Sequence, residues 1–389
     1  MSVATAFATD PRAQGAPAAH LHGAWADGLL LGGASAVAFV LLRLLDLEDG
    51  GLVLLGAVMM GLAHVVNHPH FAHSYQLFYG SWHQVRAGEF APPLARRWWW
   101  AGVVAPVLLG GFLFVAAVRA TGGDTLWFAV SLNVLGALVG WHYVKQGFGM
   151  AMVDAALKRR FWSPQARRAL LGNAYACWIA AWALINDGPG GAYWGYFRIA
   201  FDIPGEVIAA LCTAVVATTV WCGVAVTRAF EVHRQKGSGW GQLPWNGLLA
   251  YVVTLYLWTL FAWVDLAFAL VIPFFHSLQY LTVVWRYKAN EVAAKRLPAK
   301  AMWRQMGAFA AVGVVLGGLG FWVVPGLIDY VRTGALPATM SGPAAAMASA
   351  WIFINIHHYL IDNVLWRQGN PNVNRHLFQH GRPAPHSPA

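Results

Sequence analysis

The sequence predicts an all-α polytopic membrane protein, a bundle of about ten transmembrane helices with both termini in the cytoplasm. Of its 389 residues, 58% are hydrophobic and only 11% are charged, whereas soluble domains carry about 25% charged residues. The 21 Trp and 21 Phe residues are typical of rings at membrane interfaces and on lipid-facing helices. Apolar runs close to the roughly 20 residues needed to cross a bilayer also recur along the whole chain.

These runs define the predicted helices and the domain organisation. The predicted spans are 26–45, 51–67, 98–120, 125–152, 169–186, 205–230, 246–265, 267–289, 305–331 and 343–366. Asp265 and Pro273 are the only punctuation between the seventh and eighth spans. The glycine-rich segment 187–204 is expected to form a short interfacial helix. We expect one transmembrane domain over 26–368, with flexible tails at 1–25 and 369–389.

The distribution of positive charge orients the predicted bundle. With ten spans, 21 of the 26 Lys and Arg residues fall on the side that holds both termini, and four fall on the other side. The positive-inside rule assigns the richer side to the cytoplasm, as in a multi-pass protein of a bacterial-type inner (plasma) membrane. The net charge of +10 is thus explained by cytoplasmic loops, and no nucleic-acid partner is expected.

Histidines gather at a similar depth on four predicted spans that are far apart in the sequence. Polar groups inside a bilayer are costly and usually face a partner or the bundle interior, and neutral imidazole is the commonest metal ligand. The predicted metal ligands are His64, His68, His70, His73, His142, His276, His357, His358 and Asp362.

Local spacing supports this metal prediction. His64 and His68 are four residues apart, on one helix face, and Pro69 allows a new helical start that aims His70 and His73 at the same zone. Asp362 lies four residues after His358, so its carboxylate can ligate a metal or hold an imidazole.

The ligand types favour iron, copper or zinc. Eight histidines are too many for one tetrahedral zinc ion and about enough for two irons, so we expect one or two iron ions, with copper or haem as the alternative. The three cysteines, Cys177, Cys212 and Cys222, lie in other apolar segments and are interpreted as small hydrophobic residues.

The motifs HxxxH at 64–68, HxxH at 70–73 and HH at 357–358 resemble the histidine boxes of integral-membrane fatty acid desaturases and hydroxylases. Single histidines on separate spans are also similar to Brp/Blh-type membrane carotenoid dioxygenases. The resemblance implies a histidine-ligated non-haem oxidoreductase, with two irons as the expected centre. Such an enzyme would use O₂ to desaturate, hydroxylate or oxidatively cleave an apolar, lipid-like substrate drawn from the bilayer.

Other residues are expected to assist at this site. Tyr75, Gln146 and Tyr280 would orient the substrate or O₂, and Lys145 would contact the substrate. An electron donor would approach the basic cytoplasmic face. Two alternatives remain open at this point: a haem- or copper-binding membrane redox protein, and a metal or proton transporter that uses a histidine relay.

Overall fold

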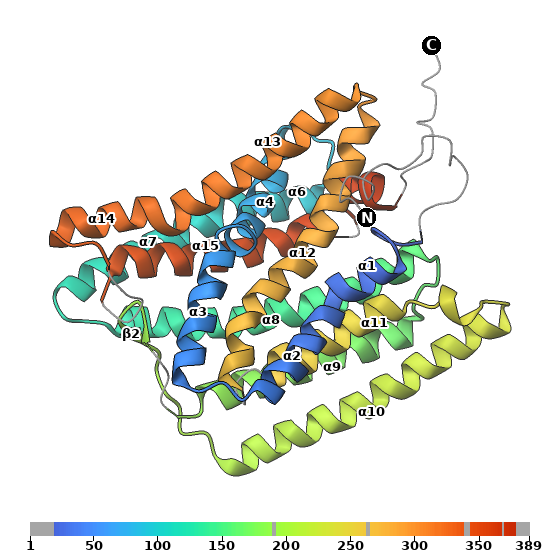
Figure 1. Ribbon diagram of the computed structural model, residues 1–389, viewed down its shortest axis with the longest axis horizontal. Helices are drawn as coiled ribbons and strands as arrows, with labels where there is room; N and C mark the ends of the chain where they lie inside the picture. Colours follow the sequence, from blue (N-terminus) through green and yellow to red (C-terminus); the bar gives the residue numbers. More distant parts are fainter. Residues whose placement is uncertain (1–18, 189–191, 262–264, 338–342, 368, 379–389) are drawn as a thin grey trace.

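The computed structural model describes residues 19–188, 192–261, 265–337, 343–367 and 369–378. Within these ranges the chain is nearly all-α, as predicted, and forms a bundle of long helices (Figure 1). The first half contains α1 Ala24–Gly28, η2 Leu29–Gly33, α2 Ala34–Leu45, α3 Asp49–Ala63, α4 Asn67–Gly80, α5 Trp82–Arg86, α6 Pro92–Trp99, η3 Trp100–Val104, α7 Ala105–Thr121, α8 Leu126–Leu157 and α9 Pro164–Asn186.

A small hairpin, β1 Ala192–Tyr193 and β2 Tyr196–Phe197, separates α9 from the second half. The second half contains α10 Gly205–Gln235, η4 Trp240–Gln242, α11 Trp245–Val252, η5 Val253–Leu260, α12 Leu266–Ala294, α13 Ala299–Gly318, η6 Leu319–Val323, α14 Val324–Thr333, α15 Ala345–Leu365, α16 Pro371–Val373 and η7 Asn374–Phe378. In the figure, α10 lies along one edge of the bundle beside α9, and α12 crosses the middle (Figure 1).

Eight helical stretches in the described ranges are long and apolar enough to cross a membrane. They coincide with eight of the ten predicted spans. The predicted span 246–265 is the shorter apolar helix Trp245–Leu260, and the predicted span 343–366 is α15. α15 contains two histidines, Asn355 and Asp362, and these polar residues lower the mean hydropathy of a helix that is otherwise apolar.

The prediction for the loop 187–204 needs correction. The segment 187–204 forms the hairpin rather than a helix in its described part, because Trp194 (φ 49°) and Gly195 (φ 78°) occupy the left-handed region. Two consecutive residues with positive φ make the tight turn that suits a two-residue hairpin loop. The residues 189–191 lie outside the described ranges.

Residues just outside the predicted domain boundaries contact the bundle. Leu21, assigned to the N-terminal tail, is buried, and its backbone N–H donates to the buried Asp27 carboxylate at 2.7 Å. Leu377, assigned to the C-terminal tail, is buried in η7, and Asn290 of α12 holds that segment by donating to the His376 carbonyl. Residues 1–18 and 379–389 of the predicted tails lie outside the described ranges.

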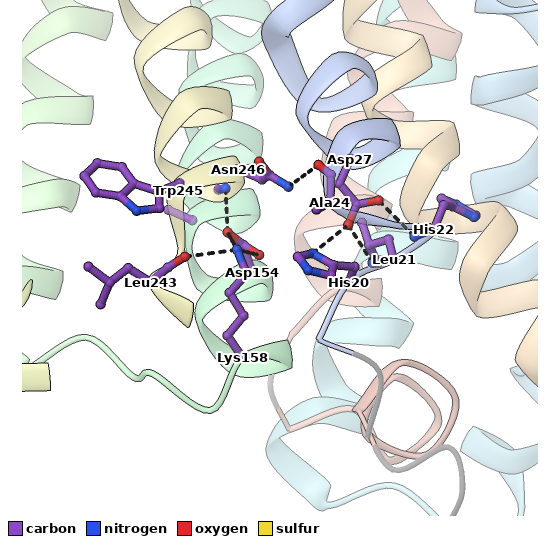
Figure 2. Close-up of polar contacts among 12 residues, drawn as sticks. His20, Leu21, His22, Ala24, Asp27, Asp154, Lys158, Leu243, Trp245 and Asn246 are labelled. Atoms are coloured by element: carbon purple, nitrogen blue, oxygen red, sulfur yellow. Dashed lines mark hydrogen bonds and ion pairs between the residues drawn. The ribbon is translucent and has the colours of Figure 1, made fainter. Parts of the chain in front are cut away.

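Buried carboxylates fix the ends of the helices that carry the histidines. Asp154 near the end of α8 accepts the backbone N–H of Gly247 at 2.8 Å and pairs with Lys158 at 3.0 Å (Figure 2). Lys158 donates in turn to the Leu243 carbonyl, so α8 and α11 are joined (Figure 2). At the start of α15, Asp329 accepts the backbone N–H groups of Ala346 and Met347, which satisfies otherwise unpaired helix donors.

The helix containing the first histidines breaks where the chain changes direction. α3 ends at Ala63 and α4 begins at Asn67, close to the new start predicted from Pro69. Glycines let α13 approach α4 closely: a Cβ on Gly317 would lie 2.8 Å from the Cβ of His68. α4 therefore lies deep in the bundle, in contact with α12, α13 and α15.

Candidate metal centre

Three helices bring four possible ligands to one point. His70 comes from α4, His142 from α8, and His358 and Asp362 from α15. One ligand atom of each lies within 4.8 Å of the corresponding atoms of the other three, and all four side chains are buried. Each of these residues is among the predicted ligands.

His276 of α12 closes the group as a fifth member. Its ring centroid lies 5.1 Å from that of His70 and 5.1 Å from that of His142, edge to face in both cases. The rings of His70 and His358 are 4.5 Å apart, and those of His142 and His358 are 5.0 Å apart. We call His70, His142, His276, His358 and Asp362 the histidine cluster.

Several ring nitrogens of the cluster lack hydrogen-bond partners in the described part of the protein. In the described part of the chain, no hydrogen bond reaches Nε2 of His70, Nε2 of His142 or either ring nitrogen of His276, and all of these atoms are buried. Leaving a buried polar atom unsatisfied costs about 1–3 kcal/mol. Several such atoms at one point indicate that a further group is needed to satisfy them.

Ser277 determines which nitrogen of His70 faces the cluster. The Ser277 hydroxyl donates to Asn67 Oδ1 at 2.7 Å. Because its only proton is used there, its oxygen accepts from His70 Nδ1–H at 3.2 Å. The proton on Nδ1 leaves the Nε2 lone pair of His70 free to bind a metal, which is the usual way a neighbour orients a ligating histidine.

Tyr280 orients the carboxylate of Asp362. Its hydroxyl donates to Asp362 Oδ1 at 2.9 Å and accepts from Trp366 Nε1 at 3.1 Å, and the Ser74 hydroxyl also contacts it. The other carboxylate oxygen, Oδ2, lies 3.2 Å from His358 Nε2 and faces the cluster. Tyr280 thus holds Oδ1, and Oδ2 is directed towards the imidazoles of the cluster.

Aromatic rings cover the cluster. Tyr143 stacks on His276 at 4.3 Å, Tyr359 stacks on His142 at 4.4 Å, and Phe71 packs edge to face on His358 at 4.6 Å. These rings keep water away from the imidazoles, so the electrostatic interactions inside the cluster are stronger than in water.

The dimensions and chemistry of the cluster fit one metal ion. Metal bonds to histidine nitrogen and carboxylate oxygen are about 2.0–2.2 Å, so ligand atoms on opposite sides of one ion lie about 4 Å apart. The observed limit of 4.8 Å is on that scale. Imidazoles together with one carboxylate are also the donor set of non-haem iron sites.

The other predicted ligands lie outside the cluster, so we correct the predicted ligand set. Both nitrogens of His357 have protein partners: Nε2 donates to the Ala101 carbonyl at 2.8 Å, and Nδ1 accepts from the Tyr75 hydroxyl at 2.9 Å. Adjacent residues on a helix point about 100° apart, so His357 cannot share the direction of His358.

The three remaining histidines of the first motifs pack against α13 and η6. His73 stacks on Phe309 at 4.2 Å and pairs with Gln76. His68 is buried and stacks on Phe321 at 4.5 Å, and the exposed His64 lies 5.1 Å from it. His68 lies two residues before His70 on α4, so the two side chains point about 200° apart, and only His64 lies before the break between α3 and α4.

Of the predicted assisting residues, some contact members of the cluster and others do not. Tyr280 touches the cluster through Asp362, whereas Tyr75 holds His357. Gln146 donates to the His276 carbonyl at 3.1 Å and to Gln279 at 2.8 Å, and its own Oε1 is buried without a partner in the described chain. Lys145 is half-buried, with its ammonium 5.4 Å from the centre of the Phe148 ring.

Sequence reasoning missed several residues that support the cluster, namely Asn67, Ser74, Tyr143, Ser277, Tyr359 and Trp366. Five of them lie next to a histidine in the sequence, as Ser277 does to His276, and this was the only available signal; Trp366 lacks even that. Which face each one uses depends on the packing of the helices.

An apolar cavity of about 210 Å³ lies beside the cluster, between α8, α9, η5 and α12. Tyr143 forms part of its wall and at the same time stacks on His276. Trp178, Trp182 and Trp258 supply most of the large rings of the lining. The cavity is thus separated from the imidazoles by one aromatic side chain.

Comparison with known protein families, with curated proteins and with solved structures finds no match to this chain. The resemblance to histidine-box enzymes therefore continues to rest on the residues of the chain itself.

Proposed function

We propose that the protein is a membrane-embedded, histidine-ligated non-haem iron oxidoreductase that uses O₂ to oxidise an apolar, lipid-like substrate. The observation that carries the proposal is the histidine cluster, with its buried imidazole nitrogens that lack partners beside a carboxylate held by Tyr280. His357, outside the cluster, has protein partners for both ring nitrogens, and the buried His68 has none for either, so the proposal rests on the convergence of unpartnered nitrogens with the Asp362 carboxylate at one point.

The proposed setting is a bacterial-type inner membrane crossed about ten times, with both termini in the cytoplasm. The uneven distribution of Lys and Arg supports this orientation. The basic side would also receive the proposed electron donor. The shorter helix Trp245–Leu260 and α15 would complete the ten spans.

Of the one or two irons expected from the count of histidines, the geometry favours one. His70, His142, His358 and Asp362 lie within reach of one ion, and His276 lies beside them. The other four predicted histidines pack elsewhere, so no second ligand group of this kind forms from them. Bound iron would supply the O₂ activation needed to desaturate, hydroxylate or cleave a hydrocarbon.

The residues of the chain have distinct roles in this proposal. Ser277 keeps His70 in the tautomer that presents Nε2, and Tyr280 aims Asp362. Gln146, with its unpartnered Oε1, is the polar group best suited to orient a bound substrate near His276. Tyr143, Tyr359 and Phe71 exclude water from the reacting centre.

The apolar cavity supports a lipid-like substrate. Its volume of about 210 Å³ and its lining of tryptophan and aliphatic side chains suit a hydrocarbon segment. A polar substrate would leave its own hydrogen-bonding groups unpaired there.

The haem alternative fits the cluster less well. Two imidazoles on opposite faces of one haem would have ring centroids about 6 Å apart, because each metal–nitrogen bond is about 2 Å long. Neighbouring rings of the cluster are 4.5–5.1 Å apart, so four imidazoles converge at a point where a haem would need room for its porphyrin between two of them. This spacing favours ligands around a single compact ion.

The proposal is tested by expressing the full chain, loading it with iron and comparing host lipid extracts by mass spectrometry with those of His358→Ala. We expect products with hydrogen lost, one oxygen atom gained, or shorter carbonyl fragments in the wild type only. His64→Ala is the matched control, because His64 lies outside the cluster. Identical lipid profiles for the wild type and His358→Ala, with iron bound to the wild type, would refute the oxidase function.

A further inference from the structure

A second cavity has a volume of about 330 Å³. None of its lining residues belongs to the histidine cluster. Its lining includes Arg159, Arg160, His233 and Lys236, together with Phe161 and Ser238. In the described ranges no carboxylate lies within ion-pairing distance of Arg159, Arg160 or Lys236. The lining is thus strongly cationic without a counter-charge from the protein.

The two loops that line this cavity are held in place. Lys158 joins the first loop to the Leu243 carbonyl at 3.0 Å, as Figure 2 shows. Arg160 donates to Gln242 at 3.0 Å, and His233 Nε2 donates to the Phe161 carbonyl at 3.2 Å. The cationic groups therefore converge on a cavity that forms without a ligand.

Two features of the arginines point to a bound anion. Nε of Arg160 is buried and has no hydrogen-bond partner in the described chain. Arg159 has φ 54°, directly after the end of α8, at a position where glycine is favoured. Glycine would suit this backbone better, so the arginine places a guanidinium at the cavity at some cost in backbone strain. Guanidinium groups bind phosphate oxygens in a bidentate way.

Neighbouring aromatic residues place the cavity at a membrane boundary. Phe161 is 66% exposed, Trp240 is 54% exposed and Trp245 is 42% exposed, around the ends of the apolar helices α8, α10 and α11. Exposed aromatic rings at helix ends are typical of the interface, at the level of lipid headgroups.

We propose that this cavity binds the phosphate headgroup of an anionic phospholipid. A phosphodiester would lie among Arg159, Arg160 and Lys236, and its acyl chains would pass the exposed rings into the bilayer. The same phosphate chemistry occurs in free inorganic phosphate, but the surrounding interfacial rings favour the lipid. The inference is independent of the proposed oxidase function, because no residue of the histidine cluster takes part.

Native mass spectrometry of the full chain in detergent would test the proposal, with phosphatidylglycerol as the probe and phosphatidylcholine as the zwitterionic comparison with no net charge. We expect Arg159→Gln and Lys236→Gln each to weaken phosphatidylglycerol binding about fivefold, the effect of one cation near an anionic surface. Arg159→Gly should weaken binding equally while keeping or raising the melting temperature, because glycine relieves the positive φ.

Arg167→Gln is the matched control, since Arg167 is an exposed cation on the first turn of α9, a few residues away. It should leave lipid binding unchanged. Equal binding of phosphatidylcholine, equal weakening in Arg167→Gln, or unchanged binding in Arg159→Gly would overturn the proposal. Displacement of the lipid by millimolar inorganic phosphate would assign the cavity to a free anion and overturn the lipid assignment.

Discussion

Ser277 offers the sharpest test of how the histidine cluster is oriented. Its oxygen accepts from His70 Nδ1 at 3.2 Å, and its proton goes to Asn67 Oδ1 at 2.7 Å. Ser277→Ala removes only this oxygen and leaves all five side chains of the cluster in place. His70 then loses the group that fixes its tautomer and its ring orientation.

The expected magnitude follows from this contact. Losing the partner that orients a ligating histidine typically lowers metal affinity 10- to 100-fold, which is about 1.4–2.7 kcal/mol. The metal-free protein is also expected to lose about 1–3 kcal/mol of stability, because His70 Nδ1–H loses an acceptor and Asn67 Oδ1 loses the Ser277 hydroxyl that donates to it. The two effects are separable, since only the first depends on metal concentration.

The assay is a competition titration of purified, detergent-solubilised protein with Fe²⁺ against a chelator of known affinity. Ser131→Ala is the matched control: Ser131 is a buried serine of α8 whose hydroxyl donates to the Trp127 carbonyl of its own helix. We expect a weaker metal affinity for Ser277→Ala and wild-type affinity for Ser131→Ala. Wild-type affinity in both variants would refute the reasoning about His70.

Three further predictions concern other contacts of the fold. Tyr280→Phe removes the hydrogen bond to Asp362 and should lower metal affinity about 10- to 100-fold in the same titration, and an unchanged affinity would contradict the role given to Tyr280. His357→Leu should leave metal affinity unchanged but lower stability by about 1–3 kcal/mol in chemical unfolding, because the Ala101 carbonyl loses its donor, and metal loss would restore His357 to the ligand set. Gly247→Ala should destabilise by roughly 1–3 kcal/mol, because the new Cβ would lie 2.7 Å from the Cβ of Asp154, whereas Gly241→Ala, with open space around it, serves as its control; equal thermal unfolding of the two variants would contradict this packing argument.

Sequence reasoning could locate the helices because apolar runs and charged loops are local properties. It also identified the helices that carry the cluster, since histidines at one depth on separate spans need a common explanation. The loop 187–204 was predicted incorrectly because two residues with positive φ, Trp194 and Gly195, determine its turn.

Selection among the histidines was harder, although part of it follows from helix geometry alone. His357 and His358 point about 100° apart on α15, so only one of them can face the cluster. His68 and His70 point about 200° apart on α4 by the same geometry. The position of His73 depends on the close approach of α13 at Gly313, which no local pattern encodes. Ser277 could be recognised only once α4 and α12 were seen in contact.

The most direct test of the central claim is the metal content of purified protein after anaerobic reconstitution with iron, measured for single alanine variants. The account predicts about one tightly bound ion per chain, lost in His142→Ala and His358→Ala and retained in His64→Ala, whose side chain lies outside the cluster. Two ions per chain, or full retention of the ion in His142→Ala and His358→Ala, would contradict it.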